Sequence, residues 1–256
     1  MIYKFRSDGL CSRLLHLWHI SYLHKTYKQK IDCIWNKTIE CDIDFHDLFV
    51  AQDFFSVRSA RINKEPVNFW GVFKDSQFIW GNEFQDIFKR PPDTYPFYAD
   101  AFKLQPHIIS EFKKLKIKYN ITNQTLGFHI RGMEAFSTRR SITEKDISSK
   151  IGGVMGKIRK ALKIDKNKKI LIASDDKDIE KKFLNQYPNN CFSIPRKYPT
   201  HKANIQNLGR DKENITQALV LLLLLSETEY TSTTGSLFSK FPDHLQRIRK
   251  VNDFLI

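Results

Sequence analysis

The chain has 256 residues, of which 41% are apolar and 13% aromatic, so it can bury a hydrophobic core and lacks the composition of a disordered protein. Its formal net charge of +14 favours an anionic partner: nucleic acid, an anionic membrane surface or a phosphorylated small molecule. Four cysteines without a CxxC pair argue against a disulfide scaffold.

Charged residues interrupt the N-terminus at once, so we expect no signal peptide there. The longest apolar run, residues 218–225, is too short to span a bilayer and reads as a buried helix or strand. We therefore expect a cytoplasmic protein and leave contact with a membrane surface open. The lysine-rich runs at residues 157–169 and 177–182 look like solvated helix faces and loops, so charge alone carries little weight.

The first part of the chain is predicted to run loop, helix, strand. Residues 12–27 have apolar side chains at helical spacing, and residues 31–35 look like a short strand. Two further strands are predicted at residues 67–73 and 77–81. A proline-rich connection follows at residues 90–98, and a helix with a basic face is predicted at residues 105–119.

The second half alternates strands and helices, which indicates an α/β fold with a parallel sheet flanked by helices. In such sheets ligands bind outside the carboxyl ends of the strands. The predicted strands lie at residues 125–131, 169–176 and 190–195, and the predicted helices at residues 143–162, 178–187 and 213–228.

Polar side chains stand at the carboxyl ends of two of these strands. Arg131 could grip a phosphate through two parallel hydrogen bonds and stabilise a diphosphate leaving group, or form an ion pair with Glu134 or a carboxylate of the Asp175 loop. His129 could contact a base or ribose, or be a satisfied core histidine. Asp176 is expected to cap the next helix.

Two short patterns suggest phosphate or metal chemistry. Residues 231–236, with small hydroxyl side chains and a glycine before a predicted helix, are similar to a phosphate-cradling loop. Asp42 and Asp44 form a D-x-D pattern that could hold a divalent cation, but we rank it below a structural role. The eight histidines have no zinc-ligand spacing.

These pieces occur in the order found in the GT-B-type fucosyltransferases, a superfamily that includes the α1,6 and nodulation-type, α1,2 and protein O-fucosyltransferases. The chain resembles them over nearly its whole length. The matching segments are residues 8–14 (a G-L-G-N-R-L-like turn), 45–49 (F-x-D-L-F), 129–134 (H-x-R-R-x-D-like), 173–176 (A-T-D-D-like), Arg210 with the helix that follows it, and the serine-rich loop 232–239.

The resemblance implies a GT-B-like fold with two Rossmann-like domains facing each other across a cleft. Residues 1–122 would be the acceptor-side domain and residues 123–256 the nucleotide-sugar domain. The activity implied is inverting transfer of a sugar, fucose from GDP-fucose, to a hydroxyl of a glycan acceptor. No metal and no other cofactor would be required, and nucleic acid would not be a partner. The oligomeric state stays open.

The resemblance also assigns roles to residues. Arg131 would bind the β-phosphate, His129 the nucleoside, and Ser236 a phosphate. The other residues expected at the nucleotide sugar are Asp175, Asp176, Arg210, Thr234, Gly235, Gly9 and Ser12. Glu134 could serve as the catalytic base or pair with Arg131, and Asp44 or Asp47 could instead supply the base.

Five positions depart from the family pattern. In the N-terminal turn, Cys11 stands in place of the second glycine and Ser12 in place of an asparagine. Gly132 stands in place of a second arginine, and Glu134 in place of an aspartate. Leu221 stands where part of the family has an aspartate that recognises guanine, and a leucine cannot accept the N–H donors of that base. The departures motivate two alternatives: a transferase that uses another nucleotide sugar, and a non-catalytic nucleotide-sugar or glycan-binding protein. The net charge of +14 motivates a third, a nucleic-acid-binding protein.

Overall fold

The computed structural model describes residues 2–4, 10–37, 41–61, 102–132, 144–198, 211–233 and 237–251. The chain divides into two compact units, one formed by Met1–Pro106 with Arg247–Ile256 and the other by His107–Gln246. The predicted elements at residues 67–73, 77–81 and 90–98 lie outside the described residues. The functional division into residues 1–122 and 123–256 stays a prediction.

The first unit contains a parallel three-stranded sheet in the order β1-β2-β3. Its described elements are β1 (Ile2–Lys4), α1 (Leu10–Tyr27), β2 (Ile31–Lys37), α2 (Phe45–Leu48) and β3 (Phe55–Arg61). The helix predicted at residues 12–27 and the strand predicted at 31–35 are both confirmed.

An aromatic core supports this sheet. Trp35 of β2 is fully buried, and its indole Nε1–H donates to the Ile43 carbonyl at 2.8 Å. Helix α1 buries Leu14, Leu17 and other apolar side chains at helical spacing. The same helix buries Arg13, whose guanidinium carbon lies 4.9 Å from the centre of the Trp35 ring, a cation–π contact.

The second unit contains a parallel four-stranded sheet in the order β6-β5-β4-β7. Its elements are α5 (Pro106–Lys118), β4 (Leu126–Ile130), α6 (Glu144–Ile164), β5 (Ile170–Ser174), α7 (Lys177–Gln186), β6 (Cys191–Phe192), α8 (Lys212–Leu225), β7 (Glu229–Ser232) and the greater part of α9 (Leu237–Val251). The predicted alternation of strands and helices, and the parallel sheet, are confirmed.

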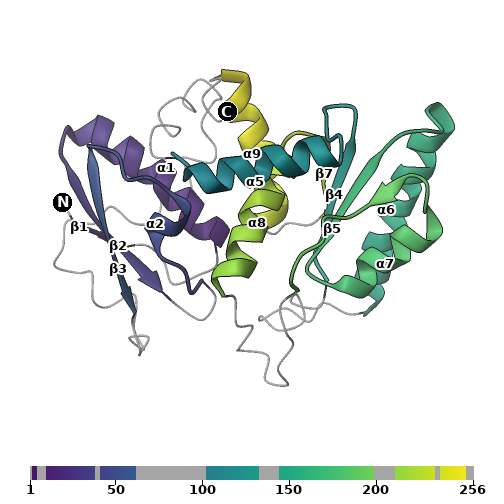
Figure 1. Ribbon diagram of the computed structural model, residues 1–256, viewed down its shortest axis with the longest axis horizontal. Helices are drawn as coiled ribbons and strands as arrows, with labels where there is room; N and C mark the ends of the chain where they lie inside the picture. Colours follow the sequence, from purple (N-terminus) through teal and green to yellow (C-terminus); the bar gives the residue numbers. More distant parts are fainter. Residues whose placement is uncertain are drawn as a thin grey trace. The chain divides into compact units, whose positions relative to one another are not determined.

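Helices cover both faces of the four-stranded sheet (Figure 1). Alternate residues of β4, such as Phe128, join a core cluster with α6 and α7. The opposite face of β4 meets α8 and α9, because Gly127 lies beside Leu225, and His129 contacts Phe238. All residues of β4 and β5 are buried, as expected for strands covered on both sides.

The apolar run at residues 218–225 is a helix, which resolves the choice between helix and strand. Residues Leu219–Leu225 of α8 are all buried in the second unit. In the described part of the chain, no helix is long and apolar enough to cross a membrane. All four cysteines are free and buried, so the expectation that the chain is not a disulfide scaffold is confirmed.

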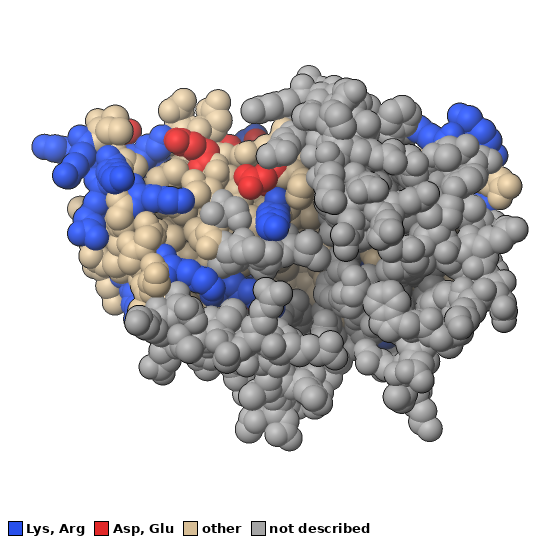
Figure 2. All heavy atoms as spheres, turned by 180° about the vertical axis from the view of Figure 1, so that it is seen from behind, with Lys and Arg blue, Asp and Glu red and all other residues tan. Residues whose placement is uncertain are grey.

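The basic side chains of the second unit are mostly exposed, as predicted for solvated helix faces. On the face shown in Figure 2, the described Lys and Arg side chains are dispersed among uncharged ones, with acidic groups between them. Lys157, Lys160 and Lys163 of α6 are exposed, as are Lys181 and Lys182 of α7. The described residues on this face therefore give no specific support to a nucleic-acid interface, which requires basic groups gathered along one face.

Candidate functional site

The site predicted at the strand ends has its centre where β4 and β5 finish side by side. Ile130, the last residue of β4, lies in register with Ser174, the last residue of β5. Counted from β4, the order of the four described strands is 3-2-1-4, which matches the first four positions of the order 3-2-1-4-5-6 in dinucleotide-binding sheets. In such a sheet the ligand crevice lies at the carboxyl end of the first strand, where His129 and Arg131 are located.

A hydrogen bond joins the two strand ends. The backbone N–H of Gly132, just after β4, donates to Oδ1 of Asp175, just after β5. Arg131 lies close enough for its charge to favour the ionised form of Asp175. The structure therefore brings together Arg131 and Asp175, two of the residues predicted to serve the nucleotide sugar.

Asp175 keeps one carboxylate oxygen unsatisfied. Its Oδ2 is buried and has no hydrogen-bond partner among the residues that the structure describes. Burial raises the pKa of Asp175 and outweighs the opposing effects of the Gly132 N–H and the Arg131 charge. A buried oxygen of this kind is costly unless it is paired, so it is suited to accept a hydrogen bond from a ligand.

Asp176 caps α7, as its position in the sequence predicted. Its Oδ1 accepts hydrogen bonds from the backbone N–H groups of Asp178 at 2.8 Å and Ile179 at 3.4 Å. These two groups would otherwise lack partners in the first turn of the helix. Asp176 therefore supports the Asp175 loop through the backbone, and the structure assigns no ligand to its carboxylate.

His129 is a buried histidine whose hydrogen bond lies within the second unit. The side chain is 5% exposed, and Nδ1 lies 2.7 Å from the hydroxyl of Ser239 in α9. Burial, with the nearby charges of Arg196 and Arg131, lowers the pKa of His129 to about 3. The imidazole is therefore neutral at physiological pH. Its predicted contact with a nucleoside stays a prediction.

We expect His129 to make the fold sensitive to acid. Its pKa is 6.5 when unperturbed and about 3 in the folded chain, so between these values only the unfolded state binds the proton. Stability is therefore lost as the pH falls below about 6.5, by about 2 kcal/mol at pH 5. Urea unfolding at pH 7.5 and pH 5 should show a smaller loss for His129→Asn than for the wild type.

The exposed His46 provides the control for that comparison. His46→Asn lies in the first unit and should leave the free energy of unfolding of the second unit unchanged. If His129→Asn loses as much stability between the two pH values as the wild type does, burial of a neutral His129 is not the cause.

The close approach of the two strand ends explains why residue 132 is a glycine. A Cβ at this position would lie 2.4 Å from the Cβ of Asp176 and 3.0 Å from the Cδ1 of Ile179. Contacts this short require one of the two backbones to move. The second arginine of the family pattern therefore has no room here.

Gly132→Ala should destabilise the chain by about 1–3 kcal/mol and displace the Asp175 loop. The matched control is Gly152→Ala on α6, where the structure shows no atom within 4 Å of the added Cβ. That change should stabilise the chain by about 0.5–1 kcal/mol, because alanine favours a helix interior. Urea denaturation of both variants measures the difference. Equal effects of the two substitutions would contradict the clash.

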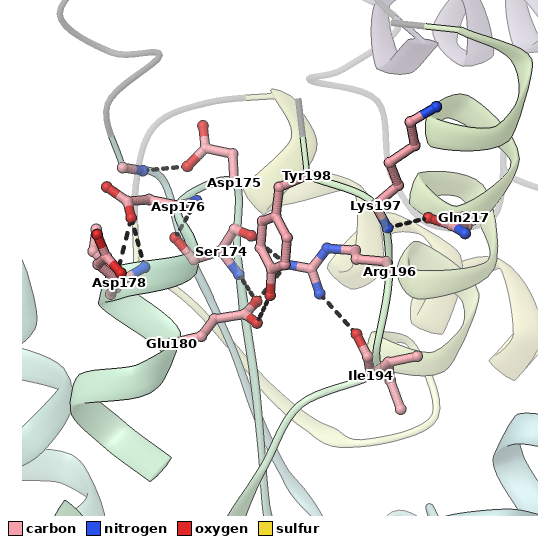
Figure 3. A network of polar contacts seen from close by, with 12 residues as sticks. Ser174, Asp175, Asp176, Asp178, Glu180, Ile194, Arg196, Lys197, Tyr198 and Gln217 are labelled. Carbon is pink, nitrogen blue, oxygen red and sulfur yellow. Dashed lines mark hydrogen bonds and ion pairs between the residues drawn. The ribbon is translucent and has the colours of Figure 1, made fainter. Parts of the chain in front are cut away.

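A buried network next to Asp175 escaped the sequence analysis. Glu180 of α7 accepts hydrogen bonds from the Ser174 N–H, the Arg196 guanidinium and the Tyr198 hydroxyl (Figure 3). Arg196 and Tyr198 follow β6 and lie 16 and 18 residues from Glu180 in sequence. No local sequence pattern predicts contacts between residues this far apart in the chain. Glu180 also lies in the lysine-rich run 177–182, which we interpreted as a solvated helix face.

Six of the predicted site residues lie outside the described residues: Gly9, Glu134, Arg210, Thr234, Gly235 and Ser236. Ser12 falls in the first turn of α1, in the first unit. Their roles, including that of Glu134 as catalytic base, stay predictions.

The D-x-D pair has a described partner in the first unit. The Lys37 ammonium lies 3.0 Å from Oδ2 of Asp44 and 3.9 Å from Oδ1 of Asp42. The backbone N–H of Asp44 donates to Oδ2 of Asp47 at the start of α2. These contacts are consistent with the structural role that we ranked first for the pair. Within the described residues there is no group of three or more side chains able to hold a metal ion.

Comparison with known proteins identifies the fold. No family model matches the chain, and no curated protein sequence matches it. Among solved structures, the chain is similar to fucosyltransferase NodZ from Bradyrhizobium, with 15% identity, a TM-score of 0.58 and coverage of 94% of this chain and 91% of that one.

The descriptions of two further similar structures name a nucleotide ligand. NodZ α-1,6-fucosyltransferase soaked with GDP-fucose has 14% identity, a TM-score of 0.58 and coverage of 95% and 92%. POFUT1 in complex with GDP has 11% identity, a TM-score of 0.50 and coverage of 97% and 94%. The chain therefore shares the α/β, GT-B-like fold of these fucosyltransferases, and the predicted fold class is confirmed.

Proposed function

We propose that the chain is an inverting glycosyltransferase that moves fucose from GDP-fucose to a hydroxyl of a glycan acceptor, without a metal ion. The observation that carries this proposal is the position of Arg131 near Asp175 at the carboxyl ends of β4 and β5, which the Gly132–Asp175 hydrogen bond joins. It occurs in a fold shared with a NodZ fucosyltransferase soaked with GDP-fucose and with POFUT1 in complex with GDP. We keep a cytoplasmic location as part of this proposal and leave contact with a membrane surface open.

The proposed reaction is a single displacement at the anomeric carbon of the sugar. The acceptor oxygen bonds to C1 while the bond between C1 and the diphosphate oxygen breaks, and GDP leaves. The Arg131 guanidinium would stabilise the negative charge that develops on the diphosphate. Glu134 is our proposed base for the acceptor proton. Arg210, Thr234, Gly235 and Ser236 would complete the diphosphate site, and Gly9 and Ser12 would contact the donor.

Leu221 favours a second candidate donor. This side chain is 4% exposed and packs among the buried residues of α8, so it offers guanine no hydrogen-bond acceptor. A transferase that binds UDP or another nucleoside diphosphate would keep the reaction and the role of Arg131 but would carry a different sugar.

Calorimetric titration with GDP, UDP, CDP and ADP, first without metal and then with Mg²⁺ or Mn²⁺, tests the proposal. Selective GDP binding without metal is the expected result. Selective UDP or CDP binding would replace GDP-fucose with the second candidate. Binding that strictly requires the metal would contradict the metal-free reaction and return attention to Asp42 and Asp44. Absence of binding to all four nucleotides would contradict the transferase and favour a glycan-binding protein.

A further inference from the structure

Glu180 and Arg196 occupy backbone groups that a neighbouring strand would normally bind. β6 ends at Phe192, which pairs with Leu171, so no strand of the described chain continues beside Ser174 on this side of β5. The Ser174 N–H instead donates to Oε1 of Glu180 at 2.6 Å, and the Ser174 carbonyl accepts from the Arg196 guanidinium. The ion pair therefore replaces a strand at the end of β5.

The pair is buried and closely tied to its surroundings. The side chains of Glu180 and Arg196 are 2% and 9% exposed. Arg196 also donates to the Ile194 carbonyl at 3.2 Å, and its guanidinium carbon lies 4.8 Å from the centre of the Tyr198 ring. The Tyr198 hydroxyl donates to Oε2 of Glu180, so both carboxylate oxygens have partners (Figure 3).

The segment that carries Arg196 and Tyr198 is also joined to α8. The backbone N–H of Lys197 donates to Oε1 of Gln217 at 2.8 Å, and the Lys197 ammonium lies 2.6 Å from Oδ2 of Asp211. Residues 194–198 therefore connect the carboxyl end of β5 with the first turns of α8. Their position is fixed from both sides.

The fixed end of β5 leads directly into the candidate site. Ser174 precedes Asp175, and its hydroxyl oxygen accepts a hydrogen bond from the Asp176 N–H at 3.1 Å. Asp175 in turn accepts the hydrogen bond from Gly132, next to Arg131. The charge of Arg196 also reaches the end of β4, because it contributes to lowering the pKa of His129.

We propose that Glu180, Arg196 and Tyr198 form a buried clamp that positions the Asp175 carboxylate. Through its hydrogen bond to Gly132, Asp175 would in turn position the neighbouring Arg131, whose guanidinium binds the diphosphate of the donor. The three are positioning residues, and the proposal rests on the function proposed above. The clamp acts on the phosphate side of the site. Its loss should therefore weaken binding of a nucleoside diphosphate more than binding of the matching monophosphate.

Arg196→Lys is the most direct test. Lysine keeps the positive charge but has no planar fork, so it cannot bind Ser174, Glu180 and Ile194 together. Calorimetric titration of the full chain with GDP and with GMP should show a loss of at least about tenfold in GDP affinity and less than about threefold in GMP affinity. The matched control is Arg159→Lys on the exposed face of α6, which should change neither affinity.

Four outcomes separate this proposal from the proposed function. If the wild type binds no nucleotide, the proposed function is wrong and the clamp proposal is overturned with it. If the wild type binds GDP and folded Arg196→Lys binds it equally well, only the clamp proposal is overturned. Equal losses of GDP and GMP affinity would also overturn it. A selective loss of GDP affinity supports it.

Tyr198→Phe keeps the proposal testable if Arg196→Lys does not fold. This change removes only the hydroxyl that donates to Glu180 and leaves the ring beside Arg196. A selective loss of about threefold in GDP affinity, with GMP affinity unchanged, supports the clamp. Unchanged affinity for both nucleotides overturns it.

Discussion

Arg131→Ala should lower the rate of sugar transfer at least about 100-fold while the chain stays folded. The expected loss is that of a donor aimed at the charge that develops on the leaving group, worth about 2.7–4 kcal/mol in activation free energy. The structure places Arg131 at the end of β4, where its charge acts on both Asp175 and His129. Release of GDP from GDP-fucose, followed with a panel of oligosaccharide acceptors, measures the rate.

Arg159→Ala is the matched control, because this arginine lies on the exposed face of α6. It should leave both the rate and the unfolding temperature unchanged. A loss below about tenfold in folded Arg131→Ala, about 1.4 kcal/mol, would contradict a role in stabilising the leaving group.

Apolar patterns predicted the framework of the second unit because its strands are covered on both faces. Largely apolar runs such as residues 126–130 and 170–173 are what a parallel sheet between two helical layers requires. Parallel strands also finish at a common edge. The sequence was therefore enough to predict that Arg131 and Asp175 stand on one rim of the sheet. In the structure the ends of β4 and β5 adjoin, and the Gly132–Asp175 hydrogen bond joins them.

The partners of buried polar groups were harder to predict because they come from distant parts of the chain. Glu180 lies in the lysine-rich run 177–182, where the expectation of a solvated face holds for Lys181 and is wrong for Glu180. Helical periodicity places Glu180 on the buried face of α7. The sequence does not show that Arg196 and Tyr198 lie beside it and donate hydrogen bonds to its carboxylate. Folding brings Glu180, which precedes β6, into contact with Arg196 and Tyr198, which follow it.

Gly132 shows a different limit of sequence reasoning. Compared with the family pattern, Gly132 replaces an arginine, which suggests a weakened diphosphate site. In the structure it is the position where the ends of β4 and β5 come too close for any side chain. The departure therefore reflects how this chain packs its strand ends, and it does not by itself favour a non-catalytic protein.

The largest change in stability is expected for Glu180→Ala. This substitution leaves the Arg196 guanidinium buried without its carboxylate and removes the acceptor for the Ser174 N–H and the Tyr198 hydroxyl. Breaking a buried ion pair by removing one partner typically costs about 3–5 kcal/mol. Urea denaturation at neutral pH should show this loss in the free energy of unfolding of the second unit.

A second variant and a control identify the buried charge as the cause. Glu180→Leu combined with Arg196→Met removes both charges and keeps similar side-chain volumes, so it should be less destabilising than Glu180→Ala. The control, Lys181→Ala, breaks the exposed pair with Asp178 on the same helix and should cause no measurable loss. If Glu180→Ala is no more destabilising than this control, or if the double variant is at least as unstable as Glu180→Ala, the cost does not arise from an unpaired buried charge. Apolar packing would then hold the end of β5 in place, and Glu180, Arg196 and Tyr198 would not be what positions Asp175.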